Sequence, residues 1–286
     1  MVPGTVGPVK FYFFLNLSSL VFKELKRMYR IAINETKYGP MMYLHNDIAF
    51  IDELKEGRIY DQGLIESIKE YFIDADIILD IGAHCGSHSI IYSKLAPNAQ
   101  IYAFEPQKKL FSILNLNIKN LSIKNVLAIN CALGNKLCDS SMAAFCIDGP
   151  NQFQILNDDL NFNFGGLQVG VGGEPIKILT LDILFKESTL FQNSNSEFLS
   201  KKIFIKIDAE GFEPYILDGG LEFITKFRPK IFFEHNNKVA NATMIDSFLE
   251  VNYNIFDKLK ELNYNIIPIV INQVLSGNYL AIPLNL

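Results

Sequence analysis

The first stretch whose residues could do chemistry is Asp80-Ile-Gly-Ala-His-Cys-Gly-Ser-His-Ser89, where an acid is followed by two glycines. Gly82 and Gly86 would let the backbone turn sharply and come close to a ligand, where a Cβ atom would clash. Asp80 would repel a pyrophosphate but attract a ligand that carries a cation or an amine. The stretch therefore predicts a loop for a nucleotide-type cofactor.

A second acid, Glu105, follows the apolar run 100–104 and lies 25 positions after Asp80. In dinucleotide-type folds an acid about 20 residues after the glycine loop, at the tip of the second strand, hydrogen-bonds the ribose hydroxyls. We expect Glu105 to fill that role and Pro106 to end the strand. Residues 130–134 would end the third strand, either as a plain turn or as the adenine side of the pocket.

The second chemical stretch is Lys206-Ile-Asp-Ala-Glu-Gly-Phe-Glu213, which holds four ionisable side chains. Strand alternation would place Lys206 and Asp208 on one face, with Glu210 near them beyond the strand end. Charged groups are costly to bury unless they pair or bind something, and ligands of open α/β sheets bind at this edge. The alternative is structural, with Lys206 paired to Asp208 or Glu210 and with Glu213 capping a helix.

The elements that must position these residues follow from hydrophobic patterning. Continuous apolar runs predict parallel strands that are buried on both faces, at 77–81, 100–104, 124–131, 202–208 and 229–234. Helical spacing of apolar residues predicts helices at 64–72, 87–95, 110–121, 214–227 and 245–262. Gly219-Gly220 should weaken or bend one of them. Two alternating runs around 273–277 predict a closing antiparallel hairpin, so the expected fold class is α/β.

Composition limits the possible functions. The chain has 286 residues, of which 49% are hydrophobic and 20% charged, as in globular proteins. Its net charge of −5 provides no overall basic field to gather nucleic acid. The four cysteines form no C-x-x-C pair, so neither a zinc site nor a disulfide framework is indicated. Reduced thiols and a cytoplasmic location are the expectation.

Two segments fall outside the regular pattern. Residues 1–40 are expected to form an N-terminal helical extension, and residues 41–286 one domain. The apolar run 11–22 is too short to span a bilayer. With the basic residues up to 30 it could pack on the domain or on a partner chain, contact a membrane surface, or act as a signal segment. Residues 135–178, rich in Gly, Asn and Asp, predict either an insertion that covers the substrate or a surface excursion.

Taken together, the motifs resemble the FkbM-like family of S-adenosylmethionine-dependent methyltransferases. The resemblance rests on Asp80–Ser89, Phe104-Glu-Pro106, Ala132-Leu-Gly134 and above all Ile205-Lys-Ile-Asp-Ala-Glu-Gly-Phe-Glu213. It implies a Rossmann-like class I methyltransferase sheet of seven strands with an antiparallel last strand, helices on both faces, and S-adenosyl-L-methionine as cofactor. The positions it assigns to cofactor binding are Asp80, Gly82, Ala83, His84, Gly86, Ser89, Glu105, Pro106, Ala132 and Asp208.

Many members of that family methylate a hydroxyl of a sugar or a small molecule, so O-methylation of a hydroxylated acceptor is the expected reaction. A positioned base must then remove the hydroxyl proton. The candidates are Asp208, Glu210, Glu234 and His235, with Glu210 preferred and with Lys206 orienting a carboxylate. His235 could equally be a satisfied polar residue at the rim. A divalent metal held by Asp208, Glu210 and Glu234 is chemically feasible, but the spacing does not demand one and none is predicted.

Three alternatives stay open. The enzyme could methylate nitrogen or a nucleic acid, and the acidic balance counts against the latter. An NAD-dependent oxidoreductase is disfavoured by the Gly82-x-x-x-Gly86 spacing and by Asp80. A non-catalytic binding module that keeps the fold is disfavoured by the intact Asp80, Gly82, Gly86 and Glu105. The patterns determine neither the acceptor nor the oligomeric state.

Overall fold

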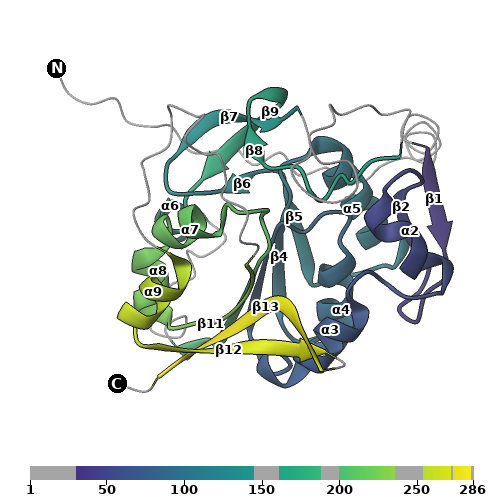
Figure 1. The fold of residues 1–286 in the computed structure, drawn as a ribbon. Coiled ribbons are helices and arrows are strands. Elements are labelled where there is room, and N and C mark those ends of the chain that lie inside the picture. Colours follow the sequence, from purple (N-terminus) through teal and green to yellow (C-terminus); the bar gives the residue numbers. More distant parts are fainter. Residues whose placement is uncertain (1–29, 145–160, 188–199, 236–253, 272, 285–286) are drawn as a thin grey trace.

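The computed structural model describes residues 30–144, 161–187, 200–235, 254–271 and 273–284, and all structural statements concern these residues. Their centre is a seven-stranded sheet (Figure 1). Across the sheet the order is β12 (Tyr264–Ile271), β13 (Val274–Pro283), β11 (Lys230–Glu234), β10 (Ile203–Ile207), β3 (Ile77–Ile81), β4 (Gln100–Phe104) and β5 (Val126–Ile129). The strands from β11 to β5 are parallel, and β12 and β13 form an antiparallel hairpin on β11. The predicted five parallel strands with a closing hairpin are confirmed.

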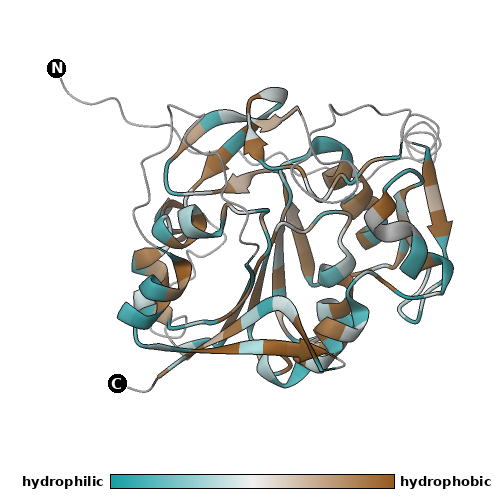
Figure 2. Cartoon of the chain, viewed as in Figure 1, coloured by the Kyte–Doolittle hydropathy of each residue, from teal (hydrophilic) through white to brown (hydrophobic). Residues whose placement is uncertain are grey.

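The central strands are buried on both faces, as their apolar sequences require. Every residue of β3 and of β10 is buried. Successive side chains point to opposite faces, so Leu79 and Ile205 join one hydrophobic core while Ile78 and Phe204 join the other. Figure 2 shows the predominantly hydrophobic colouring of these strands.

Helices cover both faces of the sheet. One core is packed by α3 (Gln62–Ser67), α4 (Ser87–Leu95) and α5 (Lys108–Asn120). The other is packed by α6 (Leu181–Glu187), α7 (Glu213–Asp218), α8 (Leu221–Phe227) and α9 (Ile255–Glu261). None of the described helices is long and apolar enough to cross a bilayer.

The predicted helix 214–227 is divided in two. α7 ends at Asp218 and α8 begins at Leu221, on either side of Gly219 and Gly220. A Cβ atom at Gly219 would lie 1.9 Å from the carbonyl oxygen of Gly134, so the chain needs a glycine where it passes that residue. The predicted helix 214–227, which was expected to be weakened or bent at Gly219-Gly220, is therefore interrupted there.

The N-terminal part of the described chain differs from the prediction. Strands β1 (Ile31–Asn34) and β2 (Met41–Leu44) form an antiparallel hairpin. A helix over 31–34 is therefore wrong, and a domain boundary at residue 40 would cut the hairpin. The reason is tertiary, because all four residues of β2 are buried and the Asn117 side chain of α5 bonds both backbone groups of Met42.

From the hairpin the chain continues through α2 (Ile48–Lys55), α3 and a 3-10 turn at Lys69–Tyr71 to the first central strand, whereas the apolar spacing predicts one helix over 64–72. The apolar run 11–22 and the start of the predicted helix 245–262 lie outside the described residues.

The segment that breaks the α/β rhythm contributes to a second, smaller sheet. Its strands follow the order β6 (Ala132–Leu133), β9 (Gly172–Leu179), β7 (Cys138–Ala143) and β8 (Val169–Gly170). Strand β7 pairs antiparallel with both β8 and β9, so the insertion contributes antiparallel strands to this sheet. The small sheet lies beyond the carboxyl ends of β4 and β5 (Figure 1).

Candidate active site

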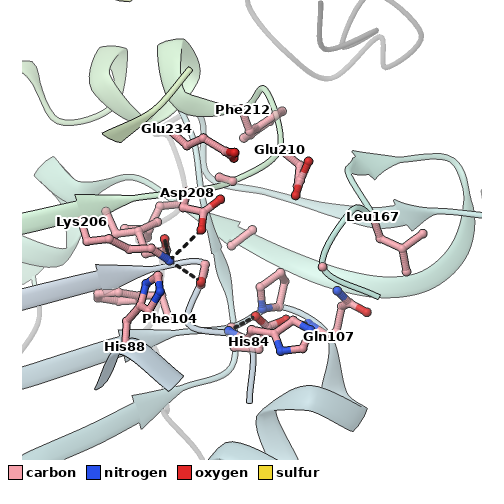
Figure 3. Close-up of a pocket in the computed structure, with 18 of the residues that line it drawn as sticks. His84, His88, Phe104, Gln107, Leu167, Lys206, Asp208, Glu210, Phe212 and Glu234 are labelled. Carbon is pink, nitrogen blue, oxygen red and sulfur yellow. Dashed lines mark hydrogen bonds and ion pairs between the residues drawn. The ribbon is translucent and has the colours of Figure 1, made fainter. Parts of the chain in front are cut away.

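A cavity opens at the carboxyl ends of the parallel strands (Figure 3). It holds about 1140 Å³ of empty space, open solvent at its mouth included. Gly82, Glu105, Asp208 and Glu234 line it from positions at or just beyond the ends of β3, β4, β10 and β11. Ligands of open α/β sheets bind at this edge, so this cavity is the candidate active site.

Most of the residues singled out in the sequence line this cavity. They are Gly82, His84, Glu105, Pro106, Ala132, Lys206, Asp208, Glu210 and Glu234. They come from two stretches of the sequence, 82–132 and 206–234, which the order of the strands in the sheet brings together.

The glycine loop is shaped by the protein's own backbone. Gly82 has φ +77°, and a Cβ atom there would lie 1.8 Å from the carbonyl oxygen of Asp208. Gly86 has φ +91°, and its Cβ would lie 2.5 Å from Leu114 Cδ1 on α5. Both positions therefore need a glycine for the close approach of the neighbouring loop and helix, and Gly82 in addition lines the cavity.

Lys206 is the centre of the charged network. Its side chain is buried, and its Nζ lies 3.3 Å from Asp80 Oδ1 and 3.4 Å from Asp208 Oδ2. The same ammonium donates to the carbonyl oxygen of Gly82 at 2.6 Å. Burial would lower the pKa of Lys206, but the two carboxylates outweigh it and raise that pKa. Lys206 therefore stays charged and ties the glycine loop to the end of β10.

Asp80 does not reach the cavity. It is fully buried, accepts a 2.5 Å hydrogen bond from Ser89 Oγ, and pairs with Lys206. The expectation that Asp80 attracts a cationic ligand directly is corrected, because its neighbours Lys206 and Ser89 take up its oxygens. Ser89 likewise serves Asp80 and does not line the cavity.

Glu105 is a buried carboxylate held by backbone amides. Its Oε2 accepts the His84 N–H and its Oε1 the Gln107 N–H, both at 2.8 Å. Burial raises the pKa of Glu105 to about 7, although the positive charge of His84 and these N–H groups act in the opposite direction. The position at the tip of β4 matches the predicted place for a ribose ligand.

His84 forms a buried ion pair with a residue that the sequence did not single out. His84 Nε2 lies 3.1 Å from Asp47 Oδ2, and Asp47 is fully buried. Burial alone would lower the pKa of His84, but the Asp47 carboxylate outweighs it and raises the pKa well above its usual value. His84 also has φ +54°, a conformation unusual for a residue with a side chain and enriched at functional sites.

Three carboxylates gather at the other end of the cavity. The ligand oxygens of Asp208, Glu210 and Glu234 lie within 4.8 Å of one another, and Figure 3 shows them converging. Burial first, and then Asp208 and Glu210, raise the pKa of Glu234 to about 10. Burial would also raise the pKa of Asp208, but Lys206 outweighs it and lowers that pKa.

At neutral pH the cluster thus holds a proton on Glu234, which donates to Asp208. Such a set of oxygens could also ligate a divalent cation.

His88 and Asp61 form a second contact between an imidazole and a carboxyl group in the lining of the cavity. His88 Nε2 lies 3.9 Å from Asp61 Oδ2, and both residues line the cavity. Burial, and then the Lys206 ammonium, lower the pKa of His88 to about 4, so the imidazole is neutral. Burial, and then Asp208, raise the pKa of Asp61 to about 7.

Three further predicted residues lie outside the cavity lining. Ala83 and Gly86 belong to the loop backbone, where the Ala83 N–H donates to the carbonyl oxygen of Phe104. His235 contacts the rings of Phe256 and Tyr279. The reason is strand alternation, because residue 235 faces away from the side to which Glu234 points. Among the described residues, His235 therefore does not lie in the lining of the cavity.

Sequence reasoning missed several lining residues. They are Tyr60, Asp61, Gln107, Asn163, Leu167 and Asn278. The segment 43–71 carries no motif that would identify Tyr60 or Asp61. Gln107 directly follows Glu105-Pro106, and this position next to the motif is the local feature that points to it.

Comparison with known proteins identifies a family. The sequence model described as "Methyltransferase FkbM domain" matches residues 80–266 of this chain. A search of curated proteins found no match.

Solved structures resemble the fold at low sequence identity. The methyltransferase FkbM from Methylobacillus flagellatus KT is 13% identical with a TM-score of 0.45, over 73% of this chain and 44% of that one. TYW2 from M. jannaschii, in complex with AdoMet, is 12% identical with a TM-score of 0.42, over 88% and 83% of the two chains. The O-methyltransferase TomG from Streptomyces achromogenes, in complex with SAM, is 13% identical with a TM-score of 0.39, over 79% and 81%.

The alignment thus covers less than half of the first of these structures. All three TM-scores are below 0.5, so these likenesses add no argument about the reaction.

Proposed function

This chain belongs to the FkbM methyltransferase domain family, and from that premise we propose that it transfers the methyl group of S-adenosyl-L-methionine to a hydroxyl of a sugar or another small molecule. The observation that carries the proposal is that one cavity joins the glycine loop and Glu105 to the carboxylates of Asp208, Glu210 and Glu234. A nucleoside-binding end and a proton-accepting end are the two parts that an O-methyl transfer requires.

The donor end fits S-adenosyl-L-methionine. Backbone amides hold both Glu105 oxygens in place, and a carboxylate oxygen has further lone pairs to accept ribose hydroxyls. Pro106 and Ala132 line the cavity and offer apolar surface for an adenine ring. Asp61 and Asp208 contribute negative charge that complements a sulfonium and an ammonium.

The acceptor end supplies alignment and a base. Bound S-adenosyl-L-methionine provides an electrophilic methyl group. Lys206 fixes Asp208, and Glu234 shares its proton with Asp208, which leaves Glu210 as the proposed base or acceptor anchor. Glu210 has φ +54°, a strained backbone conformation of the kind that is stored at functional sites. Alignment contributes several kcal/mol, and a positioned base a factor of about 10²–10⁴ in rate.

The cavity's charge favours a neutral or cationic acceptor. A polyanion such as a nucleic acid would meet the carboxylates of Asp208 and Glu210 at the cavity and a net charge of −5 on the whole chain. Cys85 and Cys131 are buried thiols, which supports a reducing, cytoplasmic setting.

A role of residues 135–178 as a substrate cover is part of the proposal.

Binding of the demethylated product S-adenosylhomocysteine is the primary test. Isothermal titration of the wild type should give a saturable heat, and Glu105→Gln should weaken binding about 10- to 100-fold, because it removes charge-assisted hydrogen bonds. The matched control is Glu70→Gln, a substitution of an exposed glutamate away from the cavity, which should not change the affinity. Absence of binding to folded wild type would refute the proposal.

Transfer of a labelled methyl group to a panel of hydroxylated acceptors tests the reaction. With an acceptor in hand, Glu210→Gln should lower kcat by about 10²- to 10⁴-fold while the affinity for S-adenosylhomocysteine stays unchanged. Equal turnover by wild type and Glu210→Gln would exclude Glu210 as the base. Turnover of amines but of no alcohol would favour N-methylation.

A further inference from the structure

The chain segment 162–169 of the insertion forms one wall of the cavity with a regular alternation. Asn163, Gly165, Leu167 and Val169 line the cavity. Figure 3 shows Leu167 and Gln107 on one side of the cavity, facing Lys206 and Asp208 on the other. Residues 162, 164 and 168, at the alternate positions of the segment, make the contacts that hold it to the rest of the protein.

The first part of this wall is attached beside the donor end. Phe162 exchanges backbone hydrogen bonds with the segment around Asp47, through the carbonyl of Asn46 at 2.9 Å and the N–H of Ile48 at 3.2 Å. The carbonyl of Phe164 accepts a 2.9 Å hydrogen bond from Gln107 Nε2, a side chain that is itself buried. The Phe162 and Phe164 rings pack edge to face at 5.4 Å.

The last part of the wall is attached at the acceptor end. The buried Gln168 side chain donates from Nε2 to the carbonyl oxygen of Glu210, and the Gln168 carbonyl accepts the Ala143 N–H at 2.8 Å. Two buried glutamines thus hold the segment, Gln107 through the carbonyl of residue 164 and Gln168 through its own side chain. Burying polar side chains is costly unless they are bonded, so this attachment is a built feature of the site.

We propose that this wall is part of the donor site and that Asn163 contacts the nucleoside half of bound S-adenosyl-L-methionine, which rests on the function proposed above. The placement follows from its neighbours. Gly165 lies against His84, since a Cβ there would be 3.8 Å from His84 Cδ2. His84 and Gln107 are the two residues whose N–H groups bind the proposed ribose ligand, Glu105.

Asn163 also has a structural task that any test must separate from ligand contact. Its Oδ1 accepts the Gly166 N–H at 3.2 Å and so supports the turn at 165–166. The substitution Asn163→Asp keeps an oxygen for Gly166 but replaces the amide NH₂ group by a second oxygen. Asn163→Ala removes both functions.

The experiment is isothermal titration with two probes, S-adenosylhomocysteine and 5′-methylthioadenosine, the second of which has the nucleoside but lacks the amino-acid part. Asn163→Ala and Asn163→Asp should weaken both probes about 3- to 10-fold, and by the same factor for each probe. The matched control is Asn161→Ala, two positions away, at an exposed asparagine that does not line the cavity. It should stay within about twofold of the wild type.

Each other outcome overturns the inference. If Asn163→Asp binds like the wild type, Asn163 only supports the turn. If S-adenosylhomocysteine is weakened but 5′-methylthioadenosine is not, the wall lies over the amino-acid half. If Asn163→Ala and Asn161→Ala behave alike while the wild type binds tightly, the wall takes no part in donor binding. Failure of the wild type to bind either probe would instead refute the proposed function.

Discussion

Replacing Lys206 by methionine perturbs the charge network that joins the glycine loop to β10. Lys206 is only 1% exposed. Its ammonium lies 3.3 Å from Asp80 Oδ1 and 3.4 Å from Asp208 Oδ2, and donates to the carbonyl oxygen of Gly82 at 2.6 Å. Methionine is unbranched and fills a similar space without a charge. The substitution therefore leaves the buried Asp80 carboxylate and the half-buried Asp208 carboxylate without their cation.

The expected loss depends on pH. Removing one partner of a buried ion pair costs about 3–5 kcal/mol of the free energy of unfolding. Without Lys206, burial raises the pKa of Asp208 above its unfolded value where the wild type has it lowered. A raised carboxyl pKa means that stability is retained at low pH and lost as the pH rises through that pKa. We therefore expect a loss of about 3–5 kcal/mol at pH 8 and a smaller one, about 1–2 kcal/mol, at pH 5.5.

Urea unfolding followed by circular dichroism at both pH values measures these losses. Lys202→Met is the matched control, because Lys202 lies just before β10 and pairs with Asp74 at 2.6 Å, with side chains 65% and 51% exposed. A pair this exposed is screened by solvent and contributes little to stability. A Lys206→Met loss no larger than that of Lys202→Met, or one that does not shrink at pH 5.5, would refute the assigned network.

Two further predictions concern folding. Gly82→Ala should lower the free energy of unfolding by more than about 3 kcal/mol or prevent folding, because its Cβ would lie 1.8 Å from the Asp208 carbonyl oxygen. Gly63→Ala, whose Cβ would have no atom within 4 Å, should be tolerated. Thermal unfolding of the two variants measures the difference. The free energy of unfolding should rise as the pH falls from 8 to 6, because burial raises the pKa values of Glu105 and Glu213 to about 7, so that the folded state binds protons that the unfolded state does not. Each group contributes on the order of 1 kcal/mol per pH unit below its pKa. Glu213→Gln should make the free energy of unfolding depend less on pH. A free energy of unfolding that falls on acidification over this range would contradict the argument.

Local patterns in the sequence were sufficient for the strands and for the acids at their tips. The apolar run of β3 and the alternation in β12 and β13 reflect burial of each strand, which is a property of neighbouring residues. The glycine loop and the break at Gly219-Gly220 can be recognised for the same reason, because a turn also depends on neighbouring residues. The amino-acid sequence alone therefore suffices to propose the roles of Glu105 and of Lys206 as a partner of carboxylates.

Contacts between distant segments cannot be inferred in this way. The ion pair of His84 with Asp47 joins the glycine loop to a segment without a motif. The position of His235 after a strand predicts a place on the catalytic rim, but its side chain faces Phe256 and Tyr279. The residues around 31–44 form a hairpin because Asn117 of α5 binds β2, a partner that lies 75 positions away.

The sequence by itself determined the strands of the central sheet and which charged side chains would lie at their ends. Only the tertiary structure decided how those side chains are used. The parallel register of β3 and β10 sets Asp80 beside Lys206, so Asp80 serves the protein's own cation and does not meet a ligand. The physical reason is that hydrophobic periodicity and turn chemistry act over a few residues, whereas pairing depends on strand order and register across the whole sheet.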